Sequence, residues 1–168
     1  RQGLRGARRR RHALPLQRVK PAFGTAAAAD IPALVELLGI LFTPEAELEP
    51  DPEKQRRALE IILADASRAR IYVARDGERI VAMAALHFTT STAEGGKVAW
   101  FEDCIVRPER RRQGLGKALL EYVIEQARAE GALRVMLLTD GDNHSAQALY
   151  RKSGFRDSAM LAMRLLLR

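Results

Sequence analysis

Residues 106–117, which read VRPERRRQGLGK, constrain the fold of this chain more than any other stretch. They follow a β-rich run, KVAWFEDCIV, and lead into an apolar-periodic run, so they join a predicted strand to a predicted helix. The first amides of a helix lack intrahelical acceptors, and the helix dipole favours anions there. Gly114 and Gly116 leave these amides accessible because neither carries a side chain. This junction is therefore predicted to bind phosphate.

Two common nucleotide-binding motifs do not fit the junction. A dinucleotide fingerprint needs a third glycine where Leu119 stands. A Walker loop needs glycine in place of Arg111, and Ser or Thr in place of Ala118. Arg111, Arg112 and Lys117 still add charged contacts for a polyanion, so a phosphate site of another kind is expected.

The remaining pattern predicts one mixed α/β domain. Asp30 is expected to cap a first helix, and residues 54–66 form a second. A β-hairpin turns at Asp76-Gly77, and further strands are expected at 97–106 and, fully buried, at 133–140. Helices are predicted at 114–131 and 143–153. Residues 159–167, AMLAMRLLL, are predicted to close the sheet.

The net charge of +7 belongs to the start of the chain. Residues 1–20 hold seven arginines and one lysine without an acid, and the other 148 residues carry 20 bases and 21 acids. Residues 1–15 are therefore expected to be a disordered basic arm, either an upstream extension or added residues, before a domain at 16–168. Nucleic-acid binding is expected only through this arm.

The apolar runs and the cysteine count limit where the protein is expected to work. No run approaches the roughly 20 apolar residues that cross a bilayer, and no apolar signal segment follows the basic start. The single cysteine, Cys104, cannot form an internal disulfide. A cytoplasmic protein without membrane contact is expected.

Two segments together resemble the GNAT family of N-acetyltransferases. The junction is similar to the family's acetyl-CoA signature, V-x-P-x-x-R-x-x-G-x-G, through Val106, Pro108, Arg111, Gly114 and Gly116. The segment NHSAQALYRKSGF resembles a second family motif through Asn143, Ala146, Tyr150, Gly154 and Phe155. Arg112 stands where many members have glycine. The resemblance covers residues 16–168 and implies a mixed, mostly antiparallel sheet flanked by helices, with a splayed central strand pair.

The resemblance also implies a mechanism in which an amine attacks the thioester of acetyl-CoA directly. The family's usual acid, which protonates the departing thiolate, corresponds to Tyr150, and the backbone beside Val106 would bind the oxyanion. The cofactor-binding residues that it implies are Ile105, Val106, Arg111, Arg112, Gln113, Gly114, Leu115, Gly116, Lys117, Asn143, Ala146 and Tyr150.

A base is also needed, because a primary amine is mostly protonated at neutral pH. Strand alternation places Glu102 and Asp103 on opposite faces, unless a bulge shifts the register. FEDCIV resembles the Leu-Glu-Asp-Phe-Phe-Val segment of diamine and polyamine acetyltransferases, in which the glutamate is the base. Glu102 is therefore predicted to be the base, with an exposed strand acid or a substrate anchor as the alternative.

The predicted acceptor is a primary amine of a small molecule, with a protein N-terminus or lysine as the alternative. Two other functions remain as alternatives: a catalytically silent acyl-CoA sensor, and a module that binds nucleic acid through the arm. A homodimer is also an open alternative. Residues 37–60 and 88–97 are expected to line the acceptor site. The acids in the first of these segments favour a cationic acceptor: Glu45, Glu47, Glu49, Asp51 and Glu53. Cys104 is expected to be a buried hydrophobe. His87 and His144 are too far apart to suggest a metal site, and none is expected.

Overall fold

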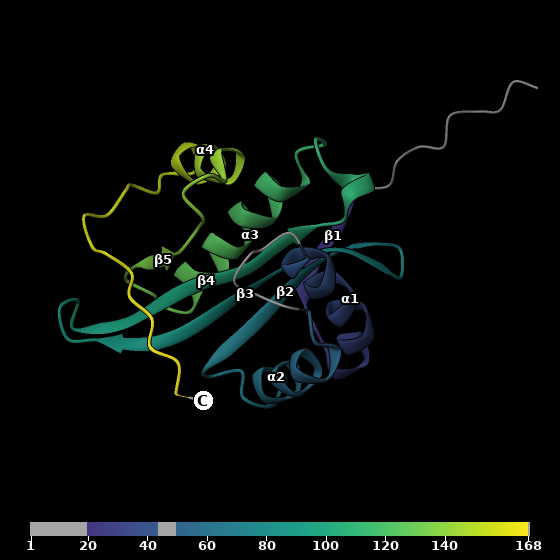
Figure 1. The fold of residues 1–168 in the computed structure, drawn as a ribbon, viewed down its shortest axis with the longest axis horizontal. Helices are drawn as coiled ribbons and strands as arrows, with labels where there is room; N and C mark the ends of the chain where they lie inside the picture. The colour runs from purple at the N-terminus through teal and green to yellow at the C-terminus, as the bar shows by residue number, and fades with distance from the viewer. Residues whose placement is uncertain (1–19, 44–49, 168) are drawn as a thin grey trace, which may run out of the picture.

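The computed structural model describes residues 20–43 and 50–167. A five-stranded sheet in the order β1-β2-β3-β4-β5 carries helices on its faces (Figure 1). Its first four strands pair antiparallel, and β5 pairs parallel to β4, so the predicted mixed, mostly antiparallel fold is confirmed. The strands are β1 Ala22–Thr25, β2 Ala69–Asp76, β3 Arg79–Ser91, β4 Gly96–Val106 and β5 Val135–Leu137. The helices are α1 Ile31–Phe42, α2 Pro52–Ala64, α3 Leu115–Ala129 and α4 His144–Lys152, with short 3-10 turns at Ala28–Asp30 and Pro108–Arg110.

The sheet separates two apolar cores. Successive residues of β2 point to opposite faces, so Ile71 and Val73 pack under α1 and α2 whereas Tyr72 and Ala74 pack against α3. Both faces of β2 and β3 are covered, which explains why these strands are apolar along most of their length rather than alternating. The predicted hairpin between them is confirmed, with Gly77 in its turn at φ +62°.

A bulge interrupts β4 at the centre of the sheet. Glu102 lies opposite Ala85 and Ile105 lies opposite Met83, so three steps along β4 match two along β3. Asp103 lies within the bulge at φ +53°, a left-handed conformation that Asp adopts more readily than most residues. The bulge allows both Phe101 and Cys104 to pack on the α3 side, although residues three positions apart on a regular strand point to opposite faces.

Strands β4 and β5 part just before this bulge. Their parallel pairing runs from Ala99 and Val135 to Phe101 and Leu137 and ends there. Beyond Phe101, the edge of β4 that faces β5 is no longer covered by strand pairing. The two strands are splayed as the family resemblance implies, although β5 lies at the edge of the sheet and the pair is therefore not central.

The end of the chain differs from the prediction. Residues 159–167 form no strand, and their apolar side chains are 63–92% exposed: Met160, Leu161, Met163, Leu165, Leu166 and Leu167. Strand β5 is consequently the sheet edge, and its three residues are half-buried rather than fully buried as predicted. An apolar run shows that a segment favours burial, but it does not specify a partner edge, and β5 offers an edge of only three residues.

The helix starts also depart from the prediction in detail. Asp30 precedes α1, but its carboxylate accepts from the Ala27 N–H and from Arg75 instead of capping the helix. The side chain of Asp51 caps α2, which therefore starts at Pro52, two residues earlier than expected. The predicted basic arm and the acids Glu45, Glu47 and Glu49 lie outside the described residues.

Candidate acetyl-transfer site

The predicted phosphate-binding junction is a row of backbone amides without acceptors. Within the described residues, no N–H from residue 112 to residue 117 donates a hydrogen bond to the protein, and Ala118 is the first that does, to the Gly114 carbonyl at 3.0 Å. Gly114 precedes α3 at φ +77°, and a Cβ there would meet no atom within 4 Å. Six consecutive amides without protein acceptors at a helix start are an arrangement that commonly binds anions in proteins.

The arginines around the junction have different tasks. Arg111 donates from Nε to the Val106 carbonyl at 3.0 Å and so lies along the end of β4. Arg110 forms an ion pair with Asp76 of the β2–β3 hairpin and also bonds to Gln113, whereas Lys117 pairs with Glu121 on the surface of α3. Sequence reasoning did not single out Arg110, because nothing in a run of arginines ranks one above another.

Arg107 is a second residue that sequence reasoning missed. It is 5% exposed, donates from Nε to the Ile80 carbonyl at 2.8 Å, and forms a bidentate ion pair with Glu36 of α1. The Arg107 guanidinium lowers the pKa of the Glu36 carboxyl through this pair. The pair fixes α1 to the end of β4, immediately before the junction. No signal in the sequence links positions 71 residues apart.

The second predicted motif is built on α4. The Asn143 side chain caps this helix by accepting from the Ala146 N–H at 3.2 Å, which accounts for the spacing of these two residues. A Cβ on Gly116 would lie 3.6 Å from Val106 and 3.9 Å from Leu149. The end of β4, the start of α3 and α4 therefore meet at Gly116, so the structure brings the two predicted motifs together.

Tyr150 lies on the inner side of α4. Its ring packs edge-on against Phe101 and Phe155, with centroid distances of 6.1 and 5.9 Å. Burial, and secondarily the nearby Cys104 thiol, raises the pKa of the Tyr150 hydroxyl, so the hydroxyl keeps its proton at neutral pH. A protonated phenol beside the parting of β4 and β5 can donate a proton to a leaving group.

Cys104 follows Phe101 on the same face of β4. Burial, and then the charge of Asp103, raises the pKa of its thiol to about 12. Because the thiolate is the reactive form of cysteine, the raised pKa argues against a nucleophilic role for this side chain at neutral pH. The sequence predicts a buried hydrophobe here, and the structure shows a partly buried side chain packed against the α3 side of the sheet.

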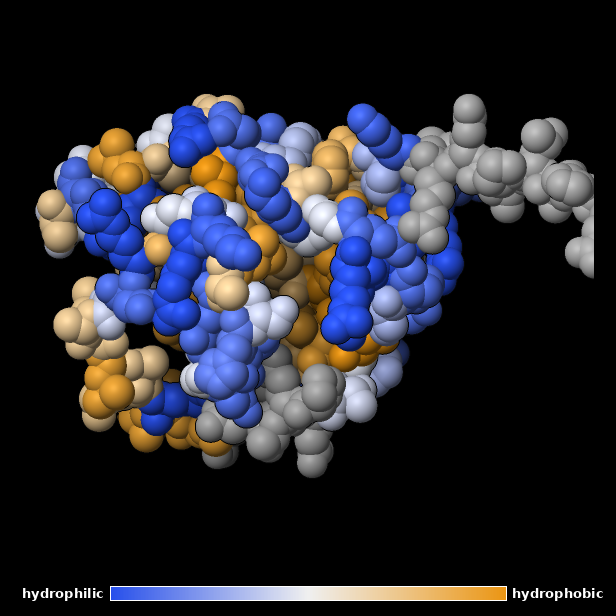
Figure 2. Space-filling model, turned by 90° about the horizontal axis from the view of Figure 1, so that it is seen from above, coloured by the Kyte–Doolittle hydropathy of each residue, from blue (hydrophilic) through white to orange (hydrophobic). Residues whose placement is uncertain are grey.

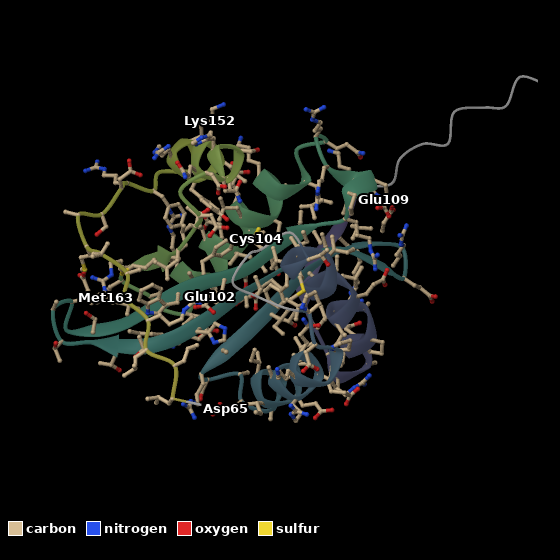
Figure 3. The ribbon with its side chains drawn as sticks, in the orientation of Figure 1. Asp65, Glu102, Cys104, Glu109, Lys152 and Met163 are labelled. Carbon is tan, nitrogen blue, oxygen red and sulfur yellow. The ribbon has the colours of Figure 1, made fainter. Side chains whose placement is uncertain are left out.

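Glu102 points to the other face of β4, the side of α1 and α2. Its side chain is 53% exposed, and its Oε2 lies 3.8 Å from Nε2 of His87 on β3. Figure 3 labels Glu102 and Cys104 along this strand. The predicted base and the predicted acid thus lie on opposite sides of β4, with the uncovered strand edge between them.

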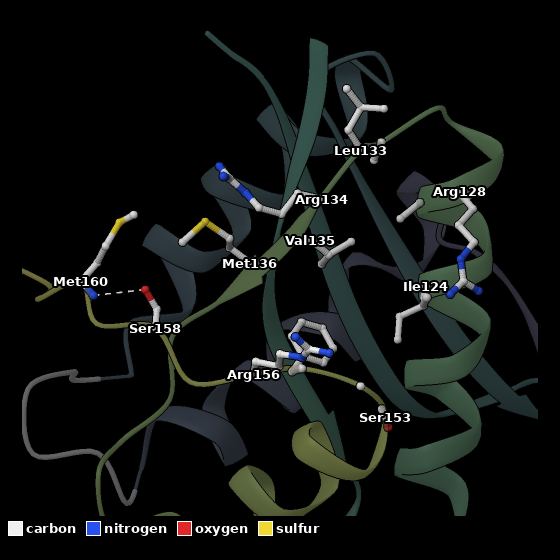
Figure 4. A pocket seen from close by; sticks show the side chains of 14 residues that line it. Ile124, Arg128, Leu133, Arg134, Val135, Met136, Ser153, Arg156, Ser158 and Met160 are labelled. Carbon is white, nitrogen blue, oxygen red and sulfur yellow. Dashed lines mark hydrogen bonds between the residues drawn. The ribbon is translucent and has the colours of Figure 1, made fainter. Parts of the chain in front are cut away.

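A cavity elsewhere in the described part of the chain lies away from this site. It measures about 500 Å³ and lies between α3, β5 and residues 153–160 (Figure 4). None of the predicted site residues lines it. It occupies the space beside β5 that the predicted closing strand leaves open. Figure 2 shows the molecule from above. On this face, hydrophilic side chains border a recess that has hydrophobic surface inside.

Two further surveys of the described residues bear on function. No group of three or more His, Cys, Asp or Glu side chains is arranged to hold a metal ion among residues 20–43 and 50–167. In the same residues, every helix is too short or too polar to cross a bilayer.

Comparison with known proteins supplies independent evidence. The profile of the Acetyltransferase (GNAT) family matches residues 31–155. Glucosamine 6-phosphate N-acetyltransferase of Trypanosoma brucei brucei is 30% identical over 133 residues, which cover 76% of this chain and 84% of that protein. Mycothiol acetyltransferase of Clavibacter michiganensis is 44% identical over 55 residues, 33% of this chain but only 18% of that protein. The ribosomal protein bS18-alanine N-acetyltransferase of Escherichia coli is 38% identical over 55 residues, which cover 33% and 37%.

Solved structures show the same fold. An integron cassette protein from the mobile metagenome of Cole Harbour Salt Marsh has a TM-score of 0.76 at 26% identity, covering 87% of this chain and 90% of that one. An acetyltransferase of Clostridium acetobutylicum, solved with acetyl-CoA, has a TM-score of 0.73 at 21% identity, covering 88% and 97%. At that identity the second likeness concerns the fold alone.

Proposed function

The chain belongs to the Acetyltransferase (GNAT) family, and from that premise we propose that it transfers the acetyl group of acetyl-CoA to a primary amine of a small molecule. The observation that carries the proposal is the row of free amides at residues 112–117, which meets α4 where Gly116 approaches Leu149, the residue before Tyr150. A phosphate-bearing acyl donor and a proton donor would then lie on the same side of β4.

The residues at the junction fit the pyrophosphate of acetyl-CoA. The open amides would hold its oxygens, Gly114 leaves room for close approach, and Arg111 and Arg112 add positive charge. The edge of β4 beyond Phe101 is not paired with β5, so the pantetheine arm could lie along the backbone at Ile105 and Val106, where the Val106 carbonyl already accepts from Arg111. The full set proposed to hold acetyl-CoA is the set that the sequence predicts, residues 105, 106, 111–117, 143, 146 and 150.

The proposed reaction is a direct transfer in which acetyl-CoA supplies an acetyl thioester. The amine nitrogen bonds to the acetyl carbon, and the carbon–sulfur bond breaks. Glu102 takes the proton that the amine loses, and Tyr150 gives its hydroxyl proton to the departing thiolate. Both residues then exchange protons with solvent, which restores them for the next turnover.

The extent of the similarity supports a small-molecule acceptor. The trypanosomal relative, whose name describes a sugar phosphate acceptor, matches along most of both chains. The Escherichia coli relative, whose name describes a protein alanine, matches over only 55 residues. A protein amine remains the second candidate because of that shorter match.

A panel assay tests the proposal. Release of CoA thiol is measured with acetyl-CoA and separate sets of amino sugars, polyamines, amino acids, aminoglycosides and peptides, and acetyl-CoA binding is measured by calorimetry. Turnover with a small amine supports the proposal. Turnover with peptides alone supports the second candidate, and acetyl-CoA binding without turnover on any amine contradicts both.

A further inference from the structure

We propose that His87 is a positioning residue that orients Glu102 for proton acceptance, an inference that rests on the proposed function. Its Nε2 lies 3.8 Å from Oε2 of Glu102, across the boundary between β3 and β4. The His87 side chain is 34% exposed, so it is held by its surroundings more than Glu102, which is 53% exposed.

The strand register explains why the two side chains meet. His87 lies opposite Trp100 and Ala85 lies opposite Glu102, so His87 and Glu102 are diagonal neighbours on one face of the sheet. Ala85 is fully buried and too small to occupy the space beside the Glu102 carboxylate. This diagonal arrangement leaves the Glu102 carboxylate 3.8 Å from the His87 ring.

The strand on the other side of β3 offers His87 no competing acid. Its partner on β2 is Ala69, and the next β2 residue on that face is Ile71. Arg70, between them, points to the opposite face, where it pairs with Glu130 at 2.7 Å. Within this part of the described sheet, Glu102 is the acid that faces the imidazole.

An imidazole N–H directed at Oε2 leaves Oε1 of Glu102 to accept the proton of the amine, directly or through one water. No proton leaves His87 in this arrangement, so the step balances between the amine and the carboxylate. The 3.8 Å separation exceeds hydrogen-bond distance. Catalytic hydrogen bonds are often long without substrate and shorten when the complex forms.

Two substitutions separate positioning from other roles. His87→Gln keeps an N–H donor near the position of Nε2, and His87→Leu removes it while keeping apolar bulk. We expect His87→Leu to lower kcat about tenfold or more, with the KM for acetyl-CoA changed less than about twofold. His87→Gln should recover most of that loss. In a Glu102→Gln background, His87→Leu should add less than about a twofold effect, because residues that act through each other are not additive.

A resonance measurement tests the contact without using activity. The imidazole ¹⁵N signals of His87, assigned by their loss in His87→Gln, should move in the Glu102→Gln variant. Those of His144, which lies at the start of α4, should not. This readout stays valid if no amine is ever turned over, a result that would count against the proposed function and not against the contact.

Three results would overturn the inference. One is full activity of a folded His87→Leu variant. Another is a double variant whose loss of kcat equals the product of the losses in His87→Leu and Glu102→Gln, because such independence would mean that the two residues do not act through each other. The third is an equal loss in His87→Gln and His87→Leu, because a donor that only orients the carboxylate can be replaced by an amide.

Discussion

The two sides of β4 hold their candidate residues in different ways. On the α3 and α4 side, Tyr150 is enclosed by Phe101 and Phe155, and the junction is fixed by a left-handed Gly114 and the ion pair of Arg110. On the α1 and α2 side, Glu102 is more than half exposed. Its carboxylate lies 3.8 Å from the His87 ring, which is longer than a hydrogen bond. We call these the donor side and the acceptor side.

The difference follows from what each side is proposed to bind. A single acyl donor can be met by fixed backbone amides and a partly buried phenol, because the same molecule binds in every turnover. An acceptor site needs a carboxylate near the amine, and an exposed carboxylate can be reached by the incoming substrate. Changes on the donor side should therefore alter chemistry or cofactor affinity, and changes on the acceptor side should depend on substrate and pH.

The largest effect is expected at Tyr150. Tyr150→Phe keeps the ring between its two aromatic neighbours and removes the hydroxyl that would protonate the thiolate. We expect kcat to fall about 10²- to 10³-fold, with the dissociation constant for acetyl-CoA changed less than about twofold. Rapid-mixing assays of CoA release and calorimetry provide the two values. Turnover near that of the wild type would make Tyr150 a packing residue.

A smaller, pH-dependent effect is expected at Glu102. Glu102→Gln preserves shape but cannot accept the proton of the amine, so turnover at pH 7 should fall about 10- to 10²-fold. Part of the loss should return at higher pH, where free amine becomes more abundant. The pH profile of kcat/KM for both proteins is the measurement.

Asp103 provides the matched control for Glu102. Asp103→Asn changes a neighbouring carboxyl within the bulge and retains a residue type that tolerates φ +53°. We expect it to be the milder substitution. A larger loss in Asp103→Asn would show that the wrong acid of the pair was chosen. A rise in KM alone in Glu102→Gln would make Glu102 a substrate anchor.

How much of each side can be predicted from sequence follows from how local its geometry is. The junction and the Asn143 cap are predictable because each is set by residues within a few positions. The contact between His87 and Glu102 depends on the register of β3 with β4 and cannot be predicted from either segment. The same limit explains the wrong prediction for residues 159–167, whose apolar pattern favours burial but does not specify a partner edge.

The cofactor junction should show a change in affinity of about tenfold. Gly114→Val introduces a branched side chain where pyrophosphate would meet the backbone, and we expect the dissociation constant for acetyl-CoA to rise at least about tenfold, or about 1.4 kcal/mol. Gly77→Val is the control, since Gly77 has a similar φ of +62° and similarly open surroundings in the β2–β3 turn. Both variants should lose stability through backbone strain. Only Gly114→Val should lose affinity, and equal affinities in calorimetry would refute the assignment of the junction.

The smallest effect is expected at Cys104, which lies on the donor side without a proposed chemical role. Cys104→Ala should retain turnover within about threefold, because a thiol with its pKa raised to about 12 carries no thiolate at neutral pH. The pH dependence of stability gives an independent check on the burial of this thiol.

The unfolded chain loses the Cys104 thiol proton near its ordinary pKa of 9, whereas the folded chain keeps it up to about 12. The folded state therefore binds more protons in this window, and the free energy of unfolding should fall as pH rises from 9 toward 12. Urea unfolding at pH 8 and pH 10 should show a larger fall for the wild type than for Cys104→Ala. An equal fall in the free energy of unfolding for both proteins would mean that the thiol is not buried. A large loss of turnover in Cys104→Ala would mean that the donor side has a second reactive group.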